Sequence, residues 1–213
     1  MLIIKTDEYD TKRYYNSNDQ LHRDDKDPIT GYTLPAILYA DGMKYWYKNN
    51  MRRRDDRDSI TGLTLPSTEY AHGGKEWWIN DERHRDDKDP ITGYTLPAIE
   101  HDDGSKEWYN NGKMHRVDKD LITGLTLPAW EDANGDKSWY KNGRFHRDDR
   151  DSITGLTLPA IVDADGTKEW LINGNLHRVD KDPLTGMILH AIEDADGTKE
   201  WWISDIEYIL IKI

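Results

Sequence analysis

The chain has 213 residues, of which 36% are hydrophobic and 33% are charged, and it contains no cysteine. Because a typical globular domain is about 45–50% apolar, this composition predicts a thin fold without one large core. Nine Trp and twelve Tyr against a single Phe exclude a disordered chain and indicate rings packed near a surface. A formal net charge of −12 argues against direct nucleic-acid binding, and the lack of cysteine excludes disulfides and thiolate metal sites.

The two ends of the chain are apolar. Met1–Lys5 is too short for a signal peptide, and no segment is long enough to span a bilayer. We therefore expect no signal peptide, no transmembrane segment and no membrane contact, and an intracellular location (the host cytoplasm) or a virion. Met1–Lys5 and Tyr208–Ile213 are expected to form strands that cap the fold, because open sheet edges promote aggregation. Pairing of these strands between chains would instead produce a homo-oligomer.

A repeat of 31 residues fills most of the chain. Six copies cover residues 22–207, and residues 10–21 form a degenerate half-copy with Tyr15 in the Trp position. Repeats 1 to 6 begin at His22, Arg53, His84, His115, His146 and His177. We expect an N-terminal capping strand and half-repeat over 1–21, a repeat array over 22–207 and a C-terminal capping strand over 208–213.

The composition of one repeat favours β structure. Each copy carries two or three Gly, in most copies a Leu-Pro step, and Asn-Gly or Asn-Asp turn pairs, all of which interrupt helices. No stretch of eleven residues free of these breakers has a helical apolar period. The sequence therefore predicts an all-β protein, an elongated antiparallel β-meander or β-solenoid in which each repeat touches only its neighbours.

Side-chain charge selects the register of the first hairpin in each repeat. A two-residue turn would oppose Glu100 and Glu107, whereas a three-residue turn ending in Gly104 opposes Glu100 and Lys106. The expected pairs are Glu100 with Lys106, Ala98 with Trp108, Leu96 with Asn110, Leu65 with Ile79 and Leu158 with Ile172. A following Asp-x-Asp-x-x-Thr-Gly run is expected to cover the sheet or to cross over to the next repeat.

The run Lys-Glu-Trp-Tyr-x-Asn-Gly-x-x-His-Arg (Lys106–Arg116) and its copies at Lys137 and Lys168 resemble a known repeat. It is similar to the Trp-Tyr-x-Asn-Gly-x-x-His-Arg repeats of phages, giant viruses and some bacteria, which are distantly MORN-like. The resemblance implies a repeat fold and a viral or phage protein with a structural or accessory role, such as interaction with host defence. The inserted Asp-x-Asp-x-x-Thr-Gly run departs from MORN repeats, so no ligand is carried over from them.

The Asp-x-Asp-x-x-Thr-Gly runs present paired carboxylates that Ca²⁺ could use. The candidate ligands are Asp25, Asp27, Asp56, Asp58, Asp87 and Asp89. The run lacks the bidentate Glu of an EF-hand loop, because Ala36 stands at that position in repeat 1. We favour a turn in which Asp25 and Thr30 bond backbone amides before Gly31, and we expect no cofactor, with calcium as the alternative.

Two aromatic positions recur side by side. The strict Trp position of each repeat is expected to form the core, and the looser position after it to contact a ligand or partner. Candidate contact residues are Tyr47, Trp78, Tyr109, Tyr140 and Trp202, together with Trp130, which replaces an Ile. The His-Arg pair is interpreted as structural, because near-copies in every repeat do not make one asymmetric catalytic site. We expect its Arg to bridge the Glu before Trp and the Asp-rich run.

These features favour a non-enzymatic scaffold that binds a protein partner. One alternative is a carbohydrate-binding or cell-envelope-binding module that uses the aromatic row. A second is an acidic DNA-mimic inhibitor, although Lys26, Arg57 and Lys88 interrupt the carboxylates that mimicry would need. An enzyme ranks last, because no unrepeated nucleophile, base or metal set is visible.

Overall fold

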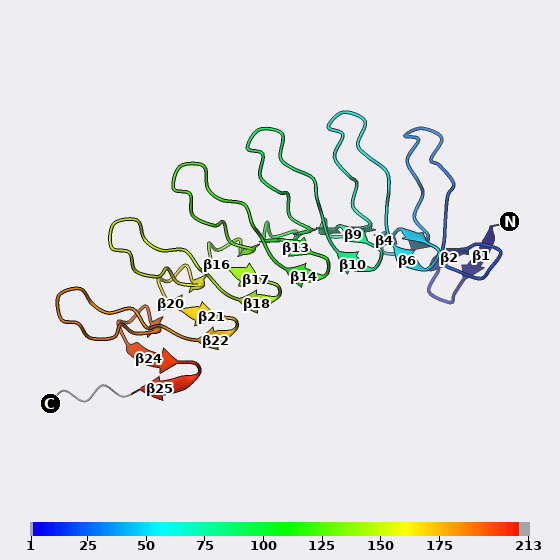
Figure 1. Ribbon diagram of the computed structural model, residues 1–213. Helices are drawn as coiled ribbons and strands as arrows, with labels where there is room; N and C mark the ends of the chain where they lie inside the picture. The colour runs from blue at the N-terminus through cyan, green and yellow to red at the C-terminus, as the bar shows by residue number, and fades with distance from the viewer. Residues whose placement is uncertain (1, 209–213) are drawn as a thin grey trace. The chain divides into compact units, whose positions relative to one another are not determined.

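The computed structural model describes residues 2–208, which contain β-strands, turns and no helix (Figure 1). The predicted all-β class is therefore confirmed, and no helix in the described part of the chain is able to cross a membrane. The chain divides into unit 1, Met1–Gly112, and unit 2, Lys113–Ile213. Each unit is described on its own.

Unit 1 contains one antiparallel sheet with the order β1-β2-β3-β4-β7-β8-β11-β12 and two separate hairpins, β5–β6 and β9–β10. Its strands are β1 (Ile3–Thr6), β2 (Lys12–Tyr15), β3 (Ile37–Leu38), β4 (Lys44–Tyr45), β5 (Tyr47–Lys48), β6 (Met51–Arg52), β7 (Thr68–Glu69), β8 (Lys75–Glu76), β9 (Trp78–Ile79), β10 (Glu82–Arg83), β11 (Ile99–Glu100), β12 (Lys106–Glu107) and β13 (Tyr109–Asn110). Strands of the main sheet follow one another in chain order, which is the predicted meander.

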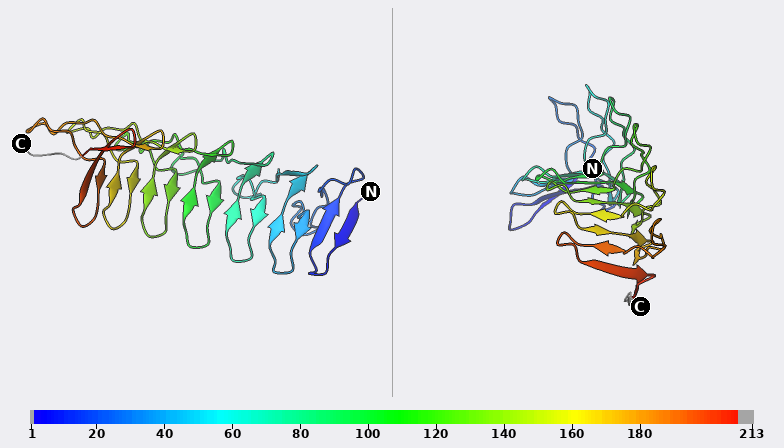
Figure 2. Two further views of the ribbon diagram at one scale, coloured as in Figure 1. Left: turned by 90° about the horizontal axis from the view of Figure 1, so that it is seen from below. Right: turned by 90° about the vertical axis from the view of Figure 1, so that its left-hand side faces the viewer.

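Unit 2 has the same organisation, with the sheet order β15-β16-β19-β20-β23-β24-β25 and the hairpins β17–β18 and β21–β22. Its strands are β14 (Lys113–Met114), β15 (Trp130–Glu131), β16 (Lys137–Ser138), β17 (Tyr140–Lys141), β18 (Arg144–Phe145), β19 (Ile161–Val162), β20 (Lys168–Glu169), β21 (Leu171–Ile172), β22 (Asn175–Leu176), β23 (Ile192–Glu193), β24 (Lys199–Ile203) and β25 (Ile206–Tyr208). Short strands side by side are visible in each unit (Figure 2).

The predicted three-residue turn and its register are confirmed. Glu100 on β11 lies opposite Lys106 on β12, so opposite charges pair across the hairpin. The amide of Gly104 donates to His101 O at 3.2 Å, and His101 N donates to Ser105 O at 2.9 Å. Gly104 has φ 96°, a value that glycine adopts without strain. The same register pairs Glu69 with Lys75 and Glu193 with Lys199.

The predicted pairs of Leu96 with Asn110, Leu65 with Ile79 and Leu158 with Ile172 are wrong. Instead, Leu96 N donates to Asp87 O at 2.8 Å, and the leucines of the other two pairs bond their own Asp-rich runs in the same way. Leu189 N donates to Asp180 O at 2.8 Å in the same way, although His190 follows it in place of Pro, so the bond to the Asp-rich run and not the proline accompanies the loss of these pairs.

The strict Trp position forms the core, as expected. The buried members are Trp46, Trp77, Trp108, Trp139 and Trp170, and each unit buries an Ala beside them. The indole N–H of Trp77 donates to Thr64 O at 2.9 Å, and the Arg85 guanidinium lies 3.7 Å from the ring centroid. These contacts satisfy the indole donor and cover its face with a cation.

Arg85 also bridges the Asp-rich run and a glutamate, although not the glutamate that was predicted. Its Nε donates to Asp87 at 3.3 Å, and NH1 donates to Glu100 at 3.0 Å. Glu76, the residue before Trp77, instead accepts the indole N–H of Trp78 at 2.6 Å. Strand β11 therefore supplies the acid, and the bridge lies within repeat 3.

In the half-repeat, Tyr14 takes the Trp position and the expectation for Tyr15 is wrong. Tyr14 is buried, its carbonyl accepts the amide of His22 at 3.0 Å, and Arg23 lies 3.7 Å from its ring centroid. The turn after it is one residue longer than an Asn-Gly turn, because Asn16 N donates to Gln20 O. Because of this longer turn, the residue at the Trp position is Tyr14, one residue before the predicted Tyr15.

Strands at the two ends take the places expected of caps. β1 begins the sheet order of unit 1 and is exposed throughout, and β25 ends the order of unit 2. Residues 209–213 of the expected capping strand 208–213 lie outside the described residues. Oligomerisation through these strands stays a prediction.

Candidate functional site

We call the six Asp-x-Asp-x-x-Thr-Gly segments, with the residues up to Thr or Ile two positions later, the Asp loops. They stand out from the strands in each unit (Figure 1). Each loop is closed at its base by one β-bridge, such as Lys26 with Thr33. The base supplies the carbonyl that accepts the buried indole N–H, as Thr33 O does for Trp46 at 2.7 Å. The base of the segment therefore contacts the core, whereas its tip is exposed, so the segment contributes to the predicted cover only at its base.

The second Asp of each loop makes the turn. Asp27 Oδ1 accepts the amides of Ile29 and Thr30 at 3.0 and 2.8 Å and the Thr30 hydroxyl at 3.0 Å. The bonds from Thr30 are the main cause that lowers the pKa of Asp27 below its ordinary value. Asp25, which was expected to make this turn, pairs with Arg23 at 3.4 Å instead.

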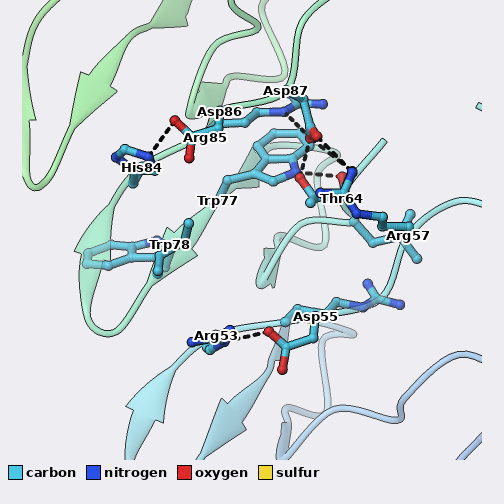
Figure 3. Close-up of a pocket in the computed structure, with 13 residues that line it drawn as sticks. Arg53, Asp55, Arg57, Thr64, Trp77, Trp78, His84, Arg85, Asp86 and Asp87 are labelled. Atoms are coloured by element: carbon cyan, nitrogen blue, oxygen red, sulfur yellow. Dashed lines mark hydrogen bonds and ion pairs between the residues drawn. The ribbon is translucent and has the colours of Figure 1, made fainter. Parts of the chain in front are cut away.

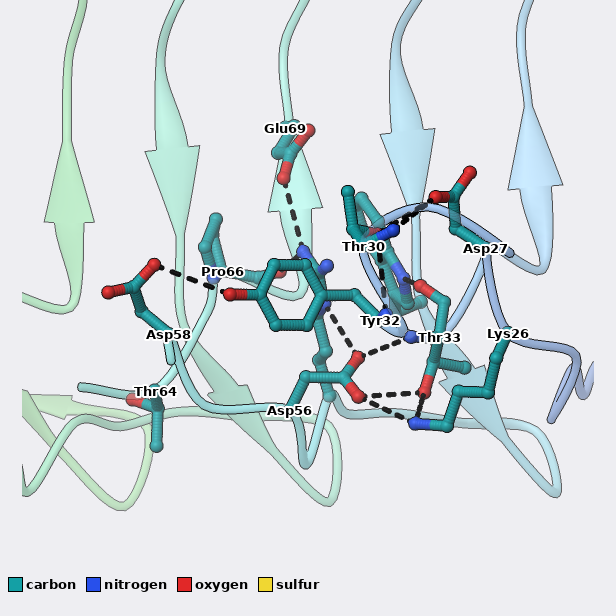
Figure 4. Close-up of polar contacts among 12 residues, drawn as sticks. Lys26, Asp27, Thr30, Tyr32, Thr33, Asp56, Asp58, Thr64, Pro66 and Glu69 are labelled. Atoms are coloured by element: carbon teal, nitrogen blue, oxygen red, sulfur yellow. Dashed lines mark hydrogen bonds and ion pairs between the residues drawn. The ribbon is translucent and has the colours of Figure 1, made fainter. Parts of the chain in front are cut away.

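The first Asp of the next loop joins neighbouring loops (Figure 4). Asp56 accepts the Thr33 amide at 2.9 Å, the Thr33 hydroxyl at 3.0 Å and the Lys26 ammonium at 2.8 Å. Arg54 Nε completes the set at 3.2 Å. Burial raises the pKa of Asp56, but bonds from Lys26, Thr33 and Arg54 outweigh it and leave that pKa below its ordinary value.

The calcium candidates are thus divided between two structural tasks. Asp56 and Asp87 bind the preceding loop, whereas Asp27, Asp58 and Asp89 each cap their own turn. Within residues 2–208 no group of three or more His, Asp or Glu side chains is placed to hold a metal ion. That the protein needs no calcium stays a prediction, which calorimetric titration with Ca²⁺ tests.

An aliphatic side chain lies at the tip of every Asp loop, and nearly all of its surface is exposed. We call these side chains the tip residues. They are Ile29, Ile60 and Ile91 in unit 1, each 92% exposed, and Ile122 (95%), Ile153 (92%) and Leu184 (94%) in unit 2. They were not among the predicted contact residues, although the sequence places an Ile or Leu at the same position within each polar turn.

In unit 1 the predicted contact residues Tyr47, Trp78 and Tyr109 do form a row, but arginines lie between them. The Arg52 guanidinium lies 5.6 Å from the Tyr47 centroid and 4.5 Å from that of Trp78. Arg83 lies 5.1 Å from Trp78 and 5.4 Å from Tyr109. The ring faces that a sugar would need are therefore covered by cations.

In unit 2 the predicted contact residues have other partners. The ring of Tyr140 packs on Phe145 with centroids 4.3 Å apart. Trp202 donates its indole N–H to Glu200 at 2.8 Å. Trp130, on β15, is half-buried rather than exposed as the partner hypothesis required. The structure does not bring these three together at one site.

Shallow grooves lie between successive repeats. The groove between repeats 2 and 3 has a volume of about 200 Å³, and Trp78, His84 and Asp86 are among the residues lining it (Figure 3). His84 Nε2 lies 2.9 Å from Asp86, which is exposed. His84 Nδ1 accepts the Asn111 amide at 3.1 Å. This bond assigns the proton of a neutral ring to Nε2, which donates to Asp86.

Arg53 replaces this His in repeat 2 and makes equivalent contacts. Its Nε donates to Asp55, and its NH1 donates to the side chain of Asn80 at 3.2 Å. A cation that cannot act as a base therefore fills the same position. This supports a structural role for the His-Arg pair.

In comparisons with known proteins, no family model matches this chain and no curated protein sequence matches it significantly.

Proposed function

We propose that this chain is a non-enzymatic repeat scaffold that binds a protein partner through the tip residues of its Asp loops. The observation that carries the proposal is the near-complete exposure of an aliphatic side chain at the same position of every loop. The resemblance noted above implies a viral or phage structural or accessory protein, and the proposal extends to such a role.

The placement of the tip residues is unfavourable for the free protein. Only 36% of the sequence is hydrophobic, yet an Ile or Leu is exposed at each tip instead of contributing to the core. Burying one such side chain against a partner is worth roughly 1.5–3 kcal/mol. Single exposed aliphatic residues are ordinary, but their recurrence at the tips indicates a contact surface.

The loops are held in shape before any partner binds. Asp89 accepts the amides of Ile91 and Thr92 at 3.0 and 2.7 Å, directly beneath the tip. Links such as Lys26 to Asp56 join adjacent loops. A loop that is already ordered loses less conformational entropy on association, which favours binding.

The polar side chains support a role without catalysis. In successive repeats the Arg after the His position bonds the first Asp of its own loop, and these bonds hold the bases of the loops. The alternative of a sugar-binding aromatic row is weakened in unit 1, where Arg52 and Arg83 lie against the rings.

Photo-crosslinking in the producing cell tests the proposal. Benzoylphenylalanine replaces Ile91 at a tip and, as a matched control, Ile79, which is 40% exposed on β9. We expect a discrete protein adduct from position 91 that is absent from position 79. The adduct should disappear when Ile29 and Ile60 are changed to Ser. Equal adducts at both positions, or none from either, would contradict the proposal, and a glycan array provides the test of the sugar alternative.

A further inference from the structure

Two grooves, one in each unit, are built from equivalent positions and differ in two side chains, Asp24 against Val117 and Arg53 against His146. The groove between repeats 1 and 2 has a volume of about 310 Å³ and includes Asp24 and Lys26 in its lining. The groove between repeats 4 and 5 has about 270 Å³, with Val117 and Lys119 at the same positions three repeats later. The chain therefore supplies its own comparison for the change from Asp to Val, next to a second difference between Arg53 and His146.

In the groove of unit 1, the carboxylate of Asp24 is hydrogen-bonded to a histidine. Asp24 accepts the Nε2–H of His22 at 2.6 Å. His22 Nδ1 accepts the amide of Asn49 at 3.2 Å, so the proton of the neutral ring lies on Nε2. Three-quarters of the Asp24 side chain is exposed, which places its carboxylate at the open side of the groove.

In unit 2 the equivalent histidine, His115, lacks that carboxylate acceptor. His115 Nδ1 accepts the amide of Asn142 at 3.3 Å, so Nε2 again carries the proton. Val117 offers no oxygen and is 69% exposed, and in the described part of the chain no carboxylate bonds His115 Nε2. Burial, and then the charge of Lys141, lower the pKa of His115, so that the donor on Nε2 belongs to a neutral ring.

The lining of this groove combines positive charge with apolar surface. Lys119, Lys141 and Asp148 line it, and Lys141 binds Asp148 at 2.7 Å. No ion pair of Lys119 is found among residues 2–208, whereas the equivalent Lys26 binds Asp56 at 2.8 Å. Val117 and Tyr140 supply apolar surface. In a chain with a net charge of −12, such a groove is a local exception that favours an anion.

We propose that the groove between repeats 4 and 5 binds a small carboxylate with a short apolar stem. The carboxylate takes the place that Asp24 has in unit 1 and accepts the Nε2–H of His115, while Lys119 adds positive charge. The stem lies against Val117 and Tyr140. None of the tip residues lines this groove, so the site is independent of the proposed protein contact.

Titration of the full-length protein with 3-phenylpropionate tests the site. We expect saturable binding of one ligand per chain, with NMR shifts at Val117 and His115. The neutral amide 3-phenylpropionamide and acetate, which lacks the stem, should each bind about tenfold more weakly or worse. Absence of saturable binding, or equal binding of the amide, would overturn the proposal.

Two variants exchange the grooves. Val117→Asp places in unit 2 the residue found at the equivalent positions of four other repeats, so it should fold, as near-ultraviolet circular dichroism verifies. Its own carboxylate should lower affinity for 3-phenylpropionate about tenfold or more. Asp24→Val should create a second site in unit 1. Unchanged affinity in the first variant, or unchanged stoichiometry in the second, would show that the side chain at this position does not control carboxylate binding.

Discussion

Replacing Asp87 with Ala should destabilise the protein by about 3 kcal/mol, whereas the same change at the adjacent Asp86 should cost less than about 1 kcal/mol. The Asp87 side chain is only 5% exposed and accepts the Thr64 amide at 2.9 Å, the Thr64 hydroxyl and Arg85 Nε at 3.3 Å. Asp86 is 85% exposed and has His84 as its partner. Two neighbours of the same chemical type thus differ in burial and in the number of bonds.

The magnitude follows from what the change leaves behind. Removing one partner of a buried ion pair costs about 3–5 kcal/mol, because the other charge stays buried. The lower end applies here, since Arg85 keeps Glu100 at 3.0 Å and Pro97 O at 3.1 Å. With a urea dependence of about 2 kcal/mol per molar, the midpoint should fall by about 1.5 M.

The pH dependence of this difference provides an internal check. Burial raises the pKa of Asp87, but hydrogen bonds from Thr64 and Arg85 outweigh it and hold the pKa below the ordinary 3.8. The carboxylate therefore makes its full contribution to the free energy of unfolding above about pH 4, and this contribution is lost as the pH falls through the pKa of Asp87 in the folded state. In urea unfolding followed by Trp fluorescence, the free energies of unfolding of the wild type and of Asp87→Ala should converge as the pH falls below the pKa of folded Asp87. Equal losses for the two substitutions at pH 7 would refute the assignment of a buried link between loops.

Three further changes test separate features. Ile91→Ser should alter the free energy of unfolding by less than about 0.5 kcal/mol, because the side chain touches little, and a larger loss in urea would mean that the tip is packed. Trp139→Phe should cost about 1–3 kcal/mol, since it leaves Thr126 O without the indole donor at 2.7 Å; calorimetry against wild type measures this. Burial and Lys141 lower the pKa of His115 in the folded protein. The contribution of this side chain to the free energy of unfolding is therefore complete above about pH 6.5, and it declines as the pH falls through the pKa of the folded state. His115→Gln should flatten the pH dependence of unfolding between pH 7 and 5, and an unchanged profile would exclude this residue.

The features predicted correctly from the sequence depend on short-range chemistry. Gly104 permits the left-handed turn, and opposite charges on Glu100 and Lys106 select between two registers of the hairpin. The strict Trp position is buried because few other large apolar side chains are available to the fold. Each of these inferences needs only residues a few positions apart.

The incorrect predictions concern contacts that neighbouring repeats decide. In unit 1 a loop takes the first Asp of the next run, as Thr33 does with Asp56, whereas Asp25, which no loop precedes, pairs with Arg23 and again leaves the turn to the second Asp, Asp27. The aromatic row was visible in the sequence, but Arg52 between Tyr47 and Trp78 was not, because it follows the intervening turn. The exposed aliphatic tips were missed although an Ile or Leu recurs within a polar turn, since apolar residues are ordinarily expected inside.

Shared and unshared positions therefore carry different information about binding. Tip residues recur in both units, so a partner that engages several loops gains affinity through effective concentration, without a strong contact at any one tip. Val117 departs from the Asp found at the equivalent positions of four repeats and leaves the donor of His115 without its usual acceptor. We expect a repeated contact to select a partner by its extent, whereas the groove at Val117, a substitution that repeat 6 shares at Val179, should select a ligand by its chemistry. Changing the tips and changing Val117 should therefore affect different ligands, and a loss of both from either change would show that the two surfaces are coupled.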